Sequence, residues 1–259
     1  MGMKVVLKTI LMVALALGVC GKAEAKCASK GISLLSERPF ISKDPVIILQ
    51  FHLASQELAP LLNVKHRIYL KGRNASVGLS VVEVLRGTYQ VTQVLLRPAT
   101  ALKEGLSYEL VIEGLSKAER PLQYFNNTTG NWEKIVLTVK GHAGETPQWK
   151  AFPSETKKTF VPMGCGPEKY VHYTIPAGTG NAVYVRALLK NRTSGKTAEQ
   201  VVVLENGVFK IGHGMCSGNF DLDAASDYEI SFALMDEEGK RSAFTKPVRL
   251  VPPASTALR

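Results

Sequence analysis

"LKEGLSYELVIEG" (residues 102–114) and "LDAASDYEISFAL" (residues 222–234) share one pattern, and that pattern is the clearest indication of the fold. In each segment a leucine precedes a tyrosine by six residues, a polar turn lies between them, and the tyrosine opens an alternating strand. Sandwich proteins place a tyrosine at such a corner and bond its hydroxyl back to the upstream backbone. Tyr108 and Tyr228 therefore predict two related sandwiches in one chain.

Strand-like runs continue on both sides of these segments, separated by turn residues at near-regular intervals. This spacing predicts an all-β protein of sandwich type. Asn206-Gly207 predicts a tight hairpin turn. Alternation along residues 226–236 predicts a half-buried strand with Ile230, Phe232 and Leu234 on one side and Glu229, Ser231 and Ala233 on the other, solvent side. The expected strands are 45–53, 67–72, 88–98, 107–115 and 132–141 in the first half, and 169–176, 181–191, 199–212, 226–236 and 244–253 in the second.

A signal-like segment and a proline-rich segment predict where the two sandwiches begin and end. Residues 1–25 combine a basic start, a short apolar run and the small residues Ala23 and Ala25, which predicts a secretory signal peptide. Residues 141–162 carry three prolines and predict a linker followed by the first strand of the second unit. The expected organisation is a signal peptide, an Ig-like sandwich over 26–144 and a second Ig- or fibronectin-type sandwich over 145–259.

The first half resembles bacterial Ig-like domains of surface and exported proteins. The resemblance lies in "RPF", "DPVIILQFHLA", "VTQVLLRPATALKEGLSYELVIEGL" and "WEKIVLTV", and it covers roughly residues 33–140. It implies a seven-stranded Greek-key sandwich, and it implies no particular activity because such modules serve as spacers, adhesive units and binding units. The second half looks like a fibronectin- or Ig-type sandwich on its strand pattern alone.

The N-terminal segment predicts a periplasmic or secreted protein. A lipoprotein anchored at Cys20 is the alternative, although Val19 departs from the usual lipoprotein signal. The expected mature chain contains no transmembrane segment, because no later apolar stretch is long enough to span a bilayer. Cys27 is an odd cysteine in an exported chain, and the sequence assigns it no role.

The net positive charge indicates an anionic partner, and the predicted export of the chain argues against nucleic acid as that partner. The chain carries 32 lysine and arginine residues against 22 acidic residues, a formal net charge of +10. A basic exported protein is attracted to anionic surfaces, whereas it would seldom meet nucleic acid. The expected partner is an unknown protein or an anionic envelope polymer.

Two cysteines of the second half can be interpreted either as a disulfide or as part of a metal site. Cys165 in "MGCG" and Cys216 in "MCSG" lie in glycine-rich turns beside expected strands, and an oxidising compartment favours pairing them. Such a disulfide would stabilise the domain by about 4 kcal/mol in the chain-entropy model. The alternative is a periplasmic copper-binding protein whose ligands are Met163, Cys165, His213, Met215 and Cys216, since thioether, thiolate and imidazole groups suit copper.

The strongest surface feature is the basic stripe, which we define as Lys65, Arg67, Lys71 and Arg73 in "KHRIYLKGR". Strand alternation places these four cations and Tyr69 on one face, along about 25 Å of extended chain. The stripe is the predicted binding site for an anionic partner. A solvated strand face, with lysines protecting a sheet edge, is the alternative.

No catalytic constellation emerges from the motifs. "SETK" (residues 154–157) matches Ser-x-x-Lys, but it lies in a proline-flanked segment where no helix is expected. The five histidines are scattered along the sequence. We therefore expect no enzyme activity, no cofactor and no metal ion, and we expect an envelope-associated interaction or scaffold module.

Overall fold

The computed structural model describes residues 31–36, 38–115, 123–126, 130–141, 144–176 and 180–254. The predicted signal peptide, Cys20 and Cys27 lie outside the described residues. The described chain is built from β-strands with one short 3₁₀-helix, η1 (Leu53–Leu61), so the all-β prediction is confirmed. Within these residues, no helix has both the length and the apolar character that a membrane crossing requires.

In the described first half, eight strands form one sheet in the spatial order β1-β3-β6-β5-β4-β7-β10-β2. A separate hairpin pairs β8 with β9. The bounds are β1 (Gly31–Leu34), β2 (Phe40–Ile41), β3 (Ile47–His52), β4 (Ile68–Lys71), β5 (Ser76–Arg86), β6 (Val91–Pro98), β7 (Ser107–Ile112), β8 (Gln123–Asn126), β9 (Asn131–Lys134) and β10 (Val136–Val139).

The long strand β5 turns this sheet into a sandwich. Its first residues pair with β4 and its later residues pair with β6, so β5 contributes to both layers of the sandwich. The register shifts between Val81 and Glu83, and an extra residue at such a bulge increases the local twist of a strand. The expected seven-stranded sandwich is therefore corrected to one folded eight-stranded sheet.

The described second half forms two sheets of seven strands in total, ordered β11-β12-β15 and β14-β13-β16-β17. The chain passes from one sheet to the other between β12 and β13, between β14 and β15 and between β15 and β16, as in Greek-key sandwiches. The bounds are β11 (Ser154–Val161), β12 (Glu168–Thr174), β13 (Tyr184–Asn191), β14 (Thr197–Val203), β15 (Val208–His213), β16 (Tyr228–Met235) and β17 (Val248–Leu250).

The turn at Asn206-Gly207 is tight, as predicted, with φ angles of 51° and 77°. Glu205 and Val208 exchange both backbone hydrogen bonds across it. The flanking strands β14 and β15 then enter different sheets instead of continuing as one hairpin. The turn therefore closes one end of the second sandwich.

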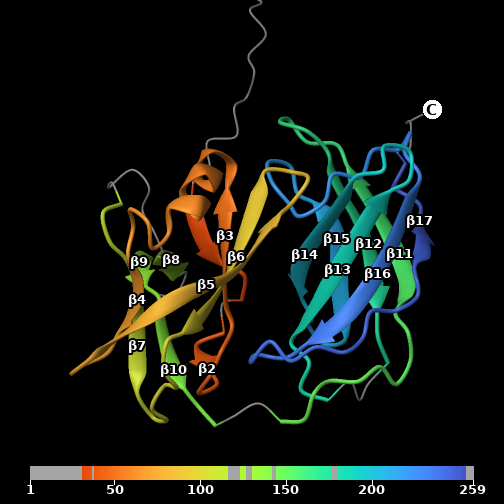
Figure 1. The fold of residues 1–259 in the computed structure, drawn as a ribbon. Helices are drawn as coiled ribbons and strands as arrows, with labels where there is room; N and C mark the ends of the chain where they lie inside the picture. Colours follow the sequence, from red (N-terminus) through yellow and green to blue (C-terminus); the bar gives the residue numbers. More distant parts are fainter. Residues whose placement is uncertain are drawn as a thin grey trace, which may run out of the picture.

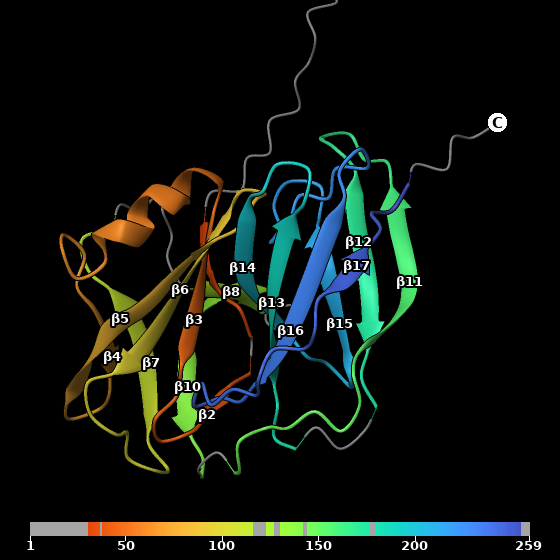
Figure 2. The same ribbon diagram turned by 45° about the vertical axis from the view of Figure 1, so that its right-hand side comes forward.

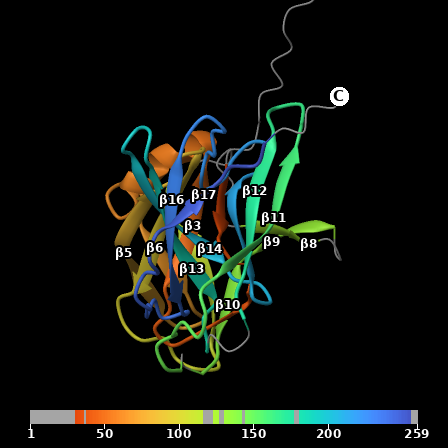
Figure 3. The ribbon, with the colours of Figure 1, turned by 90° about the vertical axis from the view of Figure 1, so that its right-hand side faces the viewer.

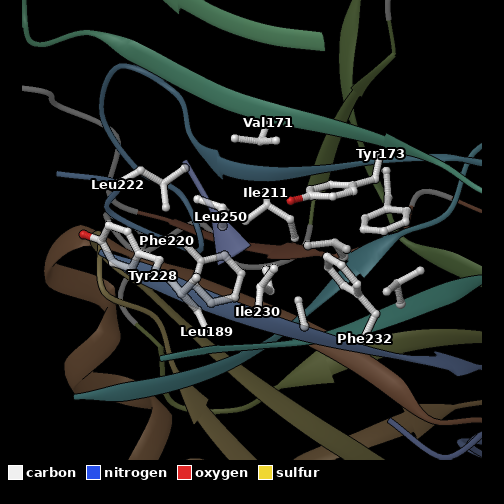
Figure 4. Close-up of a cluster of buried hydrophobic side chains, with 14 of the residues drawn as sticks. Val171, Tyr173, Leu189, Ile211, Phe220, Leu222, Tyr228, Ile230, Phe232 and Leu250 are labelled. Atoms are coloured by element: carbon white, nitrogen blue, oxygen red, sulfur yellow. The ribbon is translucent and has the colours of Figure 1, made fainter. Parts of the chain in front are cut away.

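Each half has its own hydrophobic core and its own tyrosine corner. The described core residues run from Ile32 to Val139 in the first half and from Val171 to Leu250 in the second (Figure 4). The Tyr228 hydroxyl accepts from the Asp223 amide at 3.1 Å and donates to the Asp221 carbonyl at 3.4 Å. The Tyr108 hydroxyl accepts from the Lys103 amide at 3.4 Å. The predicted corners are confirmed, and the boundary at 144/145 stays a prediction.

The two halves pack face to face through what we call the seam (Figure 1). The outer face of β3, β6 and β5 lies against the outer face of β14, β13 and β16, so four sheet layers are stacked in succession. The buried apolar residues of the seam are Val46, Ile48, Leu85 and Leu95 from the first half, and Val183, Tyr184, Val201 and Met235 from the second.

The seam overturns the expectation of a half-buried strand after Tyr228. Ser231 and Ala233, placed on the solvent side by alternation, are 7% and 0% exposed. The packing of the first half against this sheet buries both faces of β16. A strand that is buried on both faces does not need alternating polarity, and "FALM" in β16 is apolar throughout.

Candidate functional site

The predicted basic stripe lies on the outer surface of the first sandwich. Ile68 and Leu70 point into the core, and the four cations of the stripe are exposed. Strand β4 pairs with β5 on one side and β7 on the other, so it is an inner strand and needs no protection as a sheet edge. Of the four cations, Lys71 lies within β4, while the others flank it.

Carboxylates interrupt the stripe. Glu109 of β7 is the register partner of Lys71, and it also pairs with Lys134 at 2.9 Å. The pKa of Tyr69 is raised, first by its hydrogen bond to Glu113, which places a second carboxylate beside the stripe. Arg67 lies 5.4 Å from the centre of the Tyr69 ring. The stripe is therefore a surface of mixed charge.

A second cationic surface, which sequence reasoning missed, lies on the β11-β12-β15 sheet. Register places Lys157 opposite His172 and His172 opposite Lys210, so these residues form one row across three strands. We call this set the cationic row. Both lysines are exposed and His172 is half-buried. Alternation in "KYVHYT" indicates the face of His172, but only the strand register shows that two lysines flank it.

Aromatic and hydroxyl groups surround the cationic row. His172 Nε2 lies 2.9 Å from Thr159 Oγ1, and its ring meets Tyr170 edge-on at 6.3 Å. Lys210 Nζ lies 5.6 Å from the centre of the Tyr170 ring. The pKa of His172 is lowered by burial first and then by Lys210 and Lys157, while Glu168 acts in the opposite direction. The lysines on both sides therefore make protonation of His172 less favourable.

The two cysteine turns lie next to each other, as the disulfide prediction requires. A Cβ added to Gly166 would lie 3.4 Å from the carbonyl oxygen of Met215, so the turn that holds Cys165 contacts the loop that holds Cys216. In the described part of the structure no bond joins these two sulfurs. The Cys165–Cys216 disulfide stays a prediction.

The copper alternative is not favoured by the surroundings of His213. Its Nδ1 donates to the Gly214 carbonyl at 2.8 Å, and its ring stacks on Tyr89 with centroids 3.8 Å apart. Its buried Nε2 lies 3.6 Å from an Asp221 carboxylate oxygen, while Met163 is 47% exposed. Among the described residues, no group of three histidine, cysteine or acidic side chains is arranged to hold a metal ion.

Polar contacts of the seam surround one buried cation, Arg186 of β13. Its side chain is 3% exposed and binds both oxygens of Glu83 at 2.8 Å, across the two halves. Its Nε donates to Glu199 of β14 at 2.5 Å. The Gln93 side chain also donates to the Val201 carbonyl and accepts from the Val201 amide. These bonds set the register of one half against the other.

A second polar group closes the seam at the end nearest the cysteine turns. His52 lies between two hydroxyls, with Nε2 3.0 Å from Ser33 Oγ and Nδ1 3.2 Å from Ser217 Oγ. The Gly218 amide donates to the Tyr89 carbonyl at 2.8 Å. Burial lowers the pKa of His52, so its neutral form is favoured in the folded chain.

Comparisons with known proteins gave distant structural likenesses. No family model and no curated protein matches the chain. Pullulanase from Anoxybacillus sp. LM18-11 in complex with maltotriose aligns with 82% of this chain and 25% of its own, at 10% identity and a TM-score of 0.26. The chain thus spans about a quarter of that pullulanase.

Two further structures are similar over most of their own length. A cytokine receptor complex aligns with 83% of this chain and 98% of its own, at 14% identity and a TM-score of 0.26. A two-domain fibronectin type-III segment of chicken tenascin aligns with 85% and 98%, at 12% identity and a TM-score of 0.23. At such low TM-scores, the fold assignment rests on the strand order and the two cores described above.

Proposed function

We propose that this chain is a non-enzymatic, exported interaction or scaffold module of the bacterial envelope that contacts an anionic partner. The seam is the observation that carries the proposal. It buries apolar residues and a paired arginine between the two sandwiches, so their outer faces keep a fixed relative orientation. A preorganised pair of surfaces binds an extended partner at lower entropic cost than two independent modules would.

The charge of the outer surfaces supports an anionic partner. The basic stripe on the first sandwich and the cationic row on the second lie on the two outermost sheets of the stack. Figure 2 shows β4 and β11 at opposite sides of the molecule. Exposed cations on both sides suit contacts with anionic polymers on either side of the molecule, since electrostatic attraction acts before contact and falls with salt.

The test is co-sedimentation of the mature protein with isolated envelope fragments at increasing salt. The wild type is expected to sediment at low ionic strength and to be released at about 0.5 M NaCl, where exposed charges are screened. Protein that remains in the supernatant at low salt would overturn the proposal.

The contribution of the basic stripe is tested separately. Arg67→Glu with Lys71→Glu is compared with Lys190→Glu and Lys196→Glu, a control pair of exposed lysines with the same change in net charge. The stripe variant is expected to release from the envelope at lower salt than the control. Equal release by the two variants would show that the stripe acts only through net charge.

A further inference from the structure

We infer that the cationic row on the β11-β12-β15 sheet binds an acidic polysaccharide, which would lie across the three strands. This inference rests on the proposed function and names the partner class and a second contact surface. The first half covers the other sheet of this sandwich, whereas β11 and β12 lie on the side of the molecule that faces away from the first half (Figure 3). The row is therefore accessible to a partner.

The row brings two lysines onto one face of the sheet with a histidine between them. Lys157 and Lys210 are each direct register neighbours of His172, on the strands to either side of it. Lys158 is on the opposite side of β11 and pairs with Glu155 at 3.2 Å, so that carboxylate is engaged elsewhere. Glu168 is the acidic group that acts on His172.

The spacing of the lysines favours a partner with repeated charges. They lie two strands apart, so their backbones are separated by about 9.5 Å. A single carboxylate at one lysine leaves the other unneutralised, whereas a polymer with a charge on successive units reaches both. The direction of the row predicts that the polymer runs across the strands.

The residues that border the row favour sugars over other polyanions. The register neighbours on one side are Ser154, Thr174 and Val208, and on the other side Thr159, Tyr170 and Gly212. Four of these six carry hydroxyl groups, which donate and accept hydrogen bonds as sugar hydroxyls do. Val208 is 39% exposed and offers an apolar contact for the carbon face of a sugar ring.

Binding at this row is linked to proton uptake by His172. Burial lowers the pKa of His172 most, and Lys210 and Lys157 lower it further. An anion between the two lysines offsets their contribution, so we expect the pKa of the bound form to be higher than that of the free form. Glu168, Tyr170 and Thr159 also face this ring.

Affinity electrophoresis of the full mature chain tests the inference, in gels that contain polygalacturonate or neutral dextran. Lys157→Gln with Lys210→Gln is expected to weaken binding to polygalacturonate about tenfold, since each exposed ion pair contributes up to about 1 kcal/mol. Lys190→Gln with Lys196→Gln, which removes the same charge elsewhere on this sandwich, is expected to change it less than about twofold. A thermal melt of each variant confirms folding.

NMR titration of the His172 ring, assigned by comparison with His172→Gln, gives a second readout. Polygalacturonate is expected to raise the pKa of His172, and dextran is expected to leave it unchanged. Unaltered binding in the Lys157/Lys210 variant, with loss in an Arg67→Gln and Lys71→Gln variant, would overturn the inference while the proposed function stands. Wild-type protein that binds no polygalacturonate would also overturn it, and envelope co-sedimentation would then decide the proposed function independently.

Discussion

The seam ion pair offers the sharpest test of how the two halves are held together. Replacing Glu83 with Gln removes the carboxylate that binds two nitrogen atoms of Arg186 across the seam. Arg186 is 3% exposed, so its unpaired N–H groups remain largely out of water, with Glu199 as the remaining acidic partner. We expect Glu83→Gln to destabilise the folded chain.

The expected cost follows from burial on each side of the pair. Removing one partner of a fully buried ion pair costs about 3–5 kcal/mol. Glu83 is 38% exposed, so water replaces part of the lost interaction, and we expect about 2 kcal/mol. For a chain of this size that corresponds to a decrease in Tm of roughly 4–8 °C.

Urea unfolding of the wild type, Glu83→Gln, Arg186→Met and the double variant measures the coupling directly. A double-mutant cycle is needed because each single change also alters local packing. We expect a coupling free energy of about 1.5–3 kcal/mol between the two residues. A coupling below about 0.5 kcal/mol would refute the argument that this pair joins the halves.

The pH dependence of the same pair has a defined sign. The hydrogen bond from Arg186 holds the pKa of Glu83 below its usual 4.5. Its stabilising contribution is therefore present above pH 4.5 and is lost as pH falls through the lowered pKa. The difference in stability between the wild type and Glu83→Gln should shrink in that acidic range.

Three further predictions test other parts of the fold. Tyr228→Phe removes the hydroxyl that accepts from the Asp223 amide, and should lower the free energy of unfolding by about 1 kcal/mol in urea titration; an unchanged midpoint would contradict the corner. Burial lowers the pKa of His52 below 6.5, so the contribution of its neutral form to stability is complete above pH 6.5 and decreases below it. His52→Gln should therefore flatten the dependence of Tm on pH between about pH 7 and pH 5. A dependence as steep as that of the wild type would argue against His52 as the cause. Peptide mapping under non-reducing conditions tests the sequence-based pairing of Cys165 with Cys216, and a Cys216 peptide linked to any other cysteine would disprove that pairing.

Local patterns were enough for the class of fold and for its corners. The leucine, polar turn and tyrosine of residues 102–114 and 222–234 are close in sequence, so their geometry depends little on the rest of the chain. The Asn206-Gly207 turn was predictable for the same reason, because both residues tolerate positive φ angles. The strand count of the first half was not predictable, since the exchange of β5 between two neighbours depends on pairing between distant segments.

The candidate surfaces were likewise predictable only where they depend on neighbouring residues in the sequence. Alternation correctly placed Arg67 and Lys71 on an exposed face, but it did not reveal that β7 brings Glu109 beside Lys71. The cationic row was invisible because its lysines come from separate segments that only strand register brings together.

Local sequence patterns are sufficient to predict that this chain forms strands, turns its corners at Tyr108 and Tyr228, and builds two apolar cores. These features depend on alternation and turn chemistry over a few neighbouring residues. The stacking of the cores through the seam, the contact of Arg186 with Glu83, and the charges that share a face became evident only from the folded chain. Sheet faces pack through contacts between residues about a hundred positions apart, and short-range periodicity carries no information about such contacts.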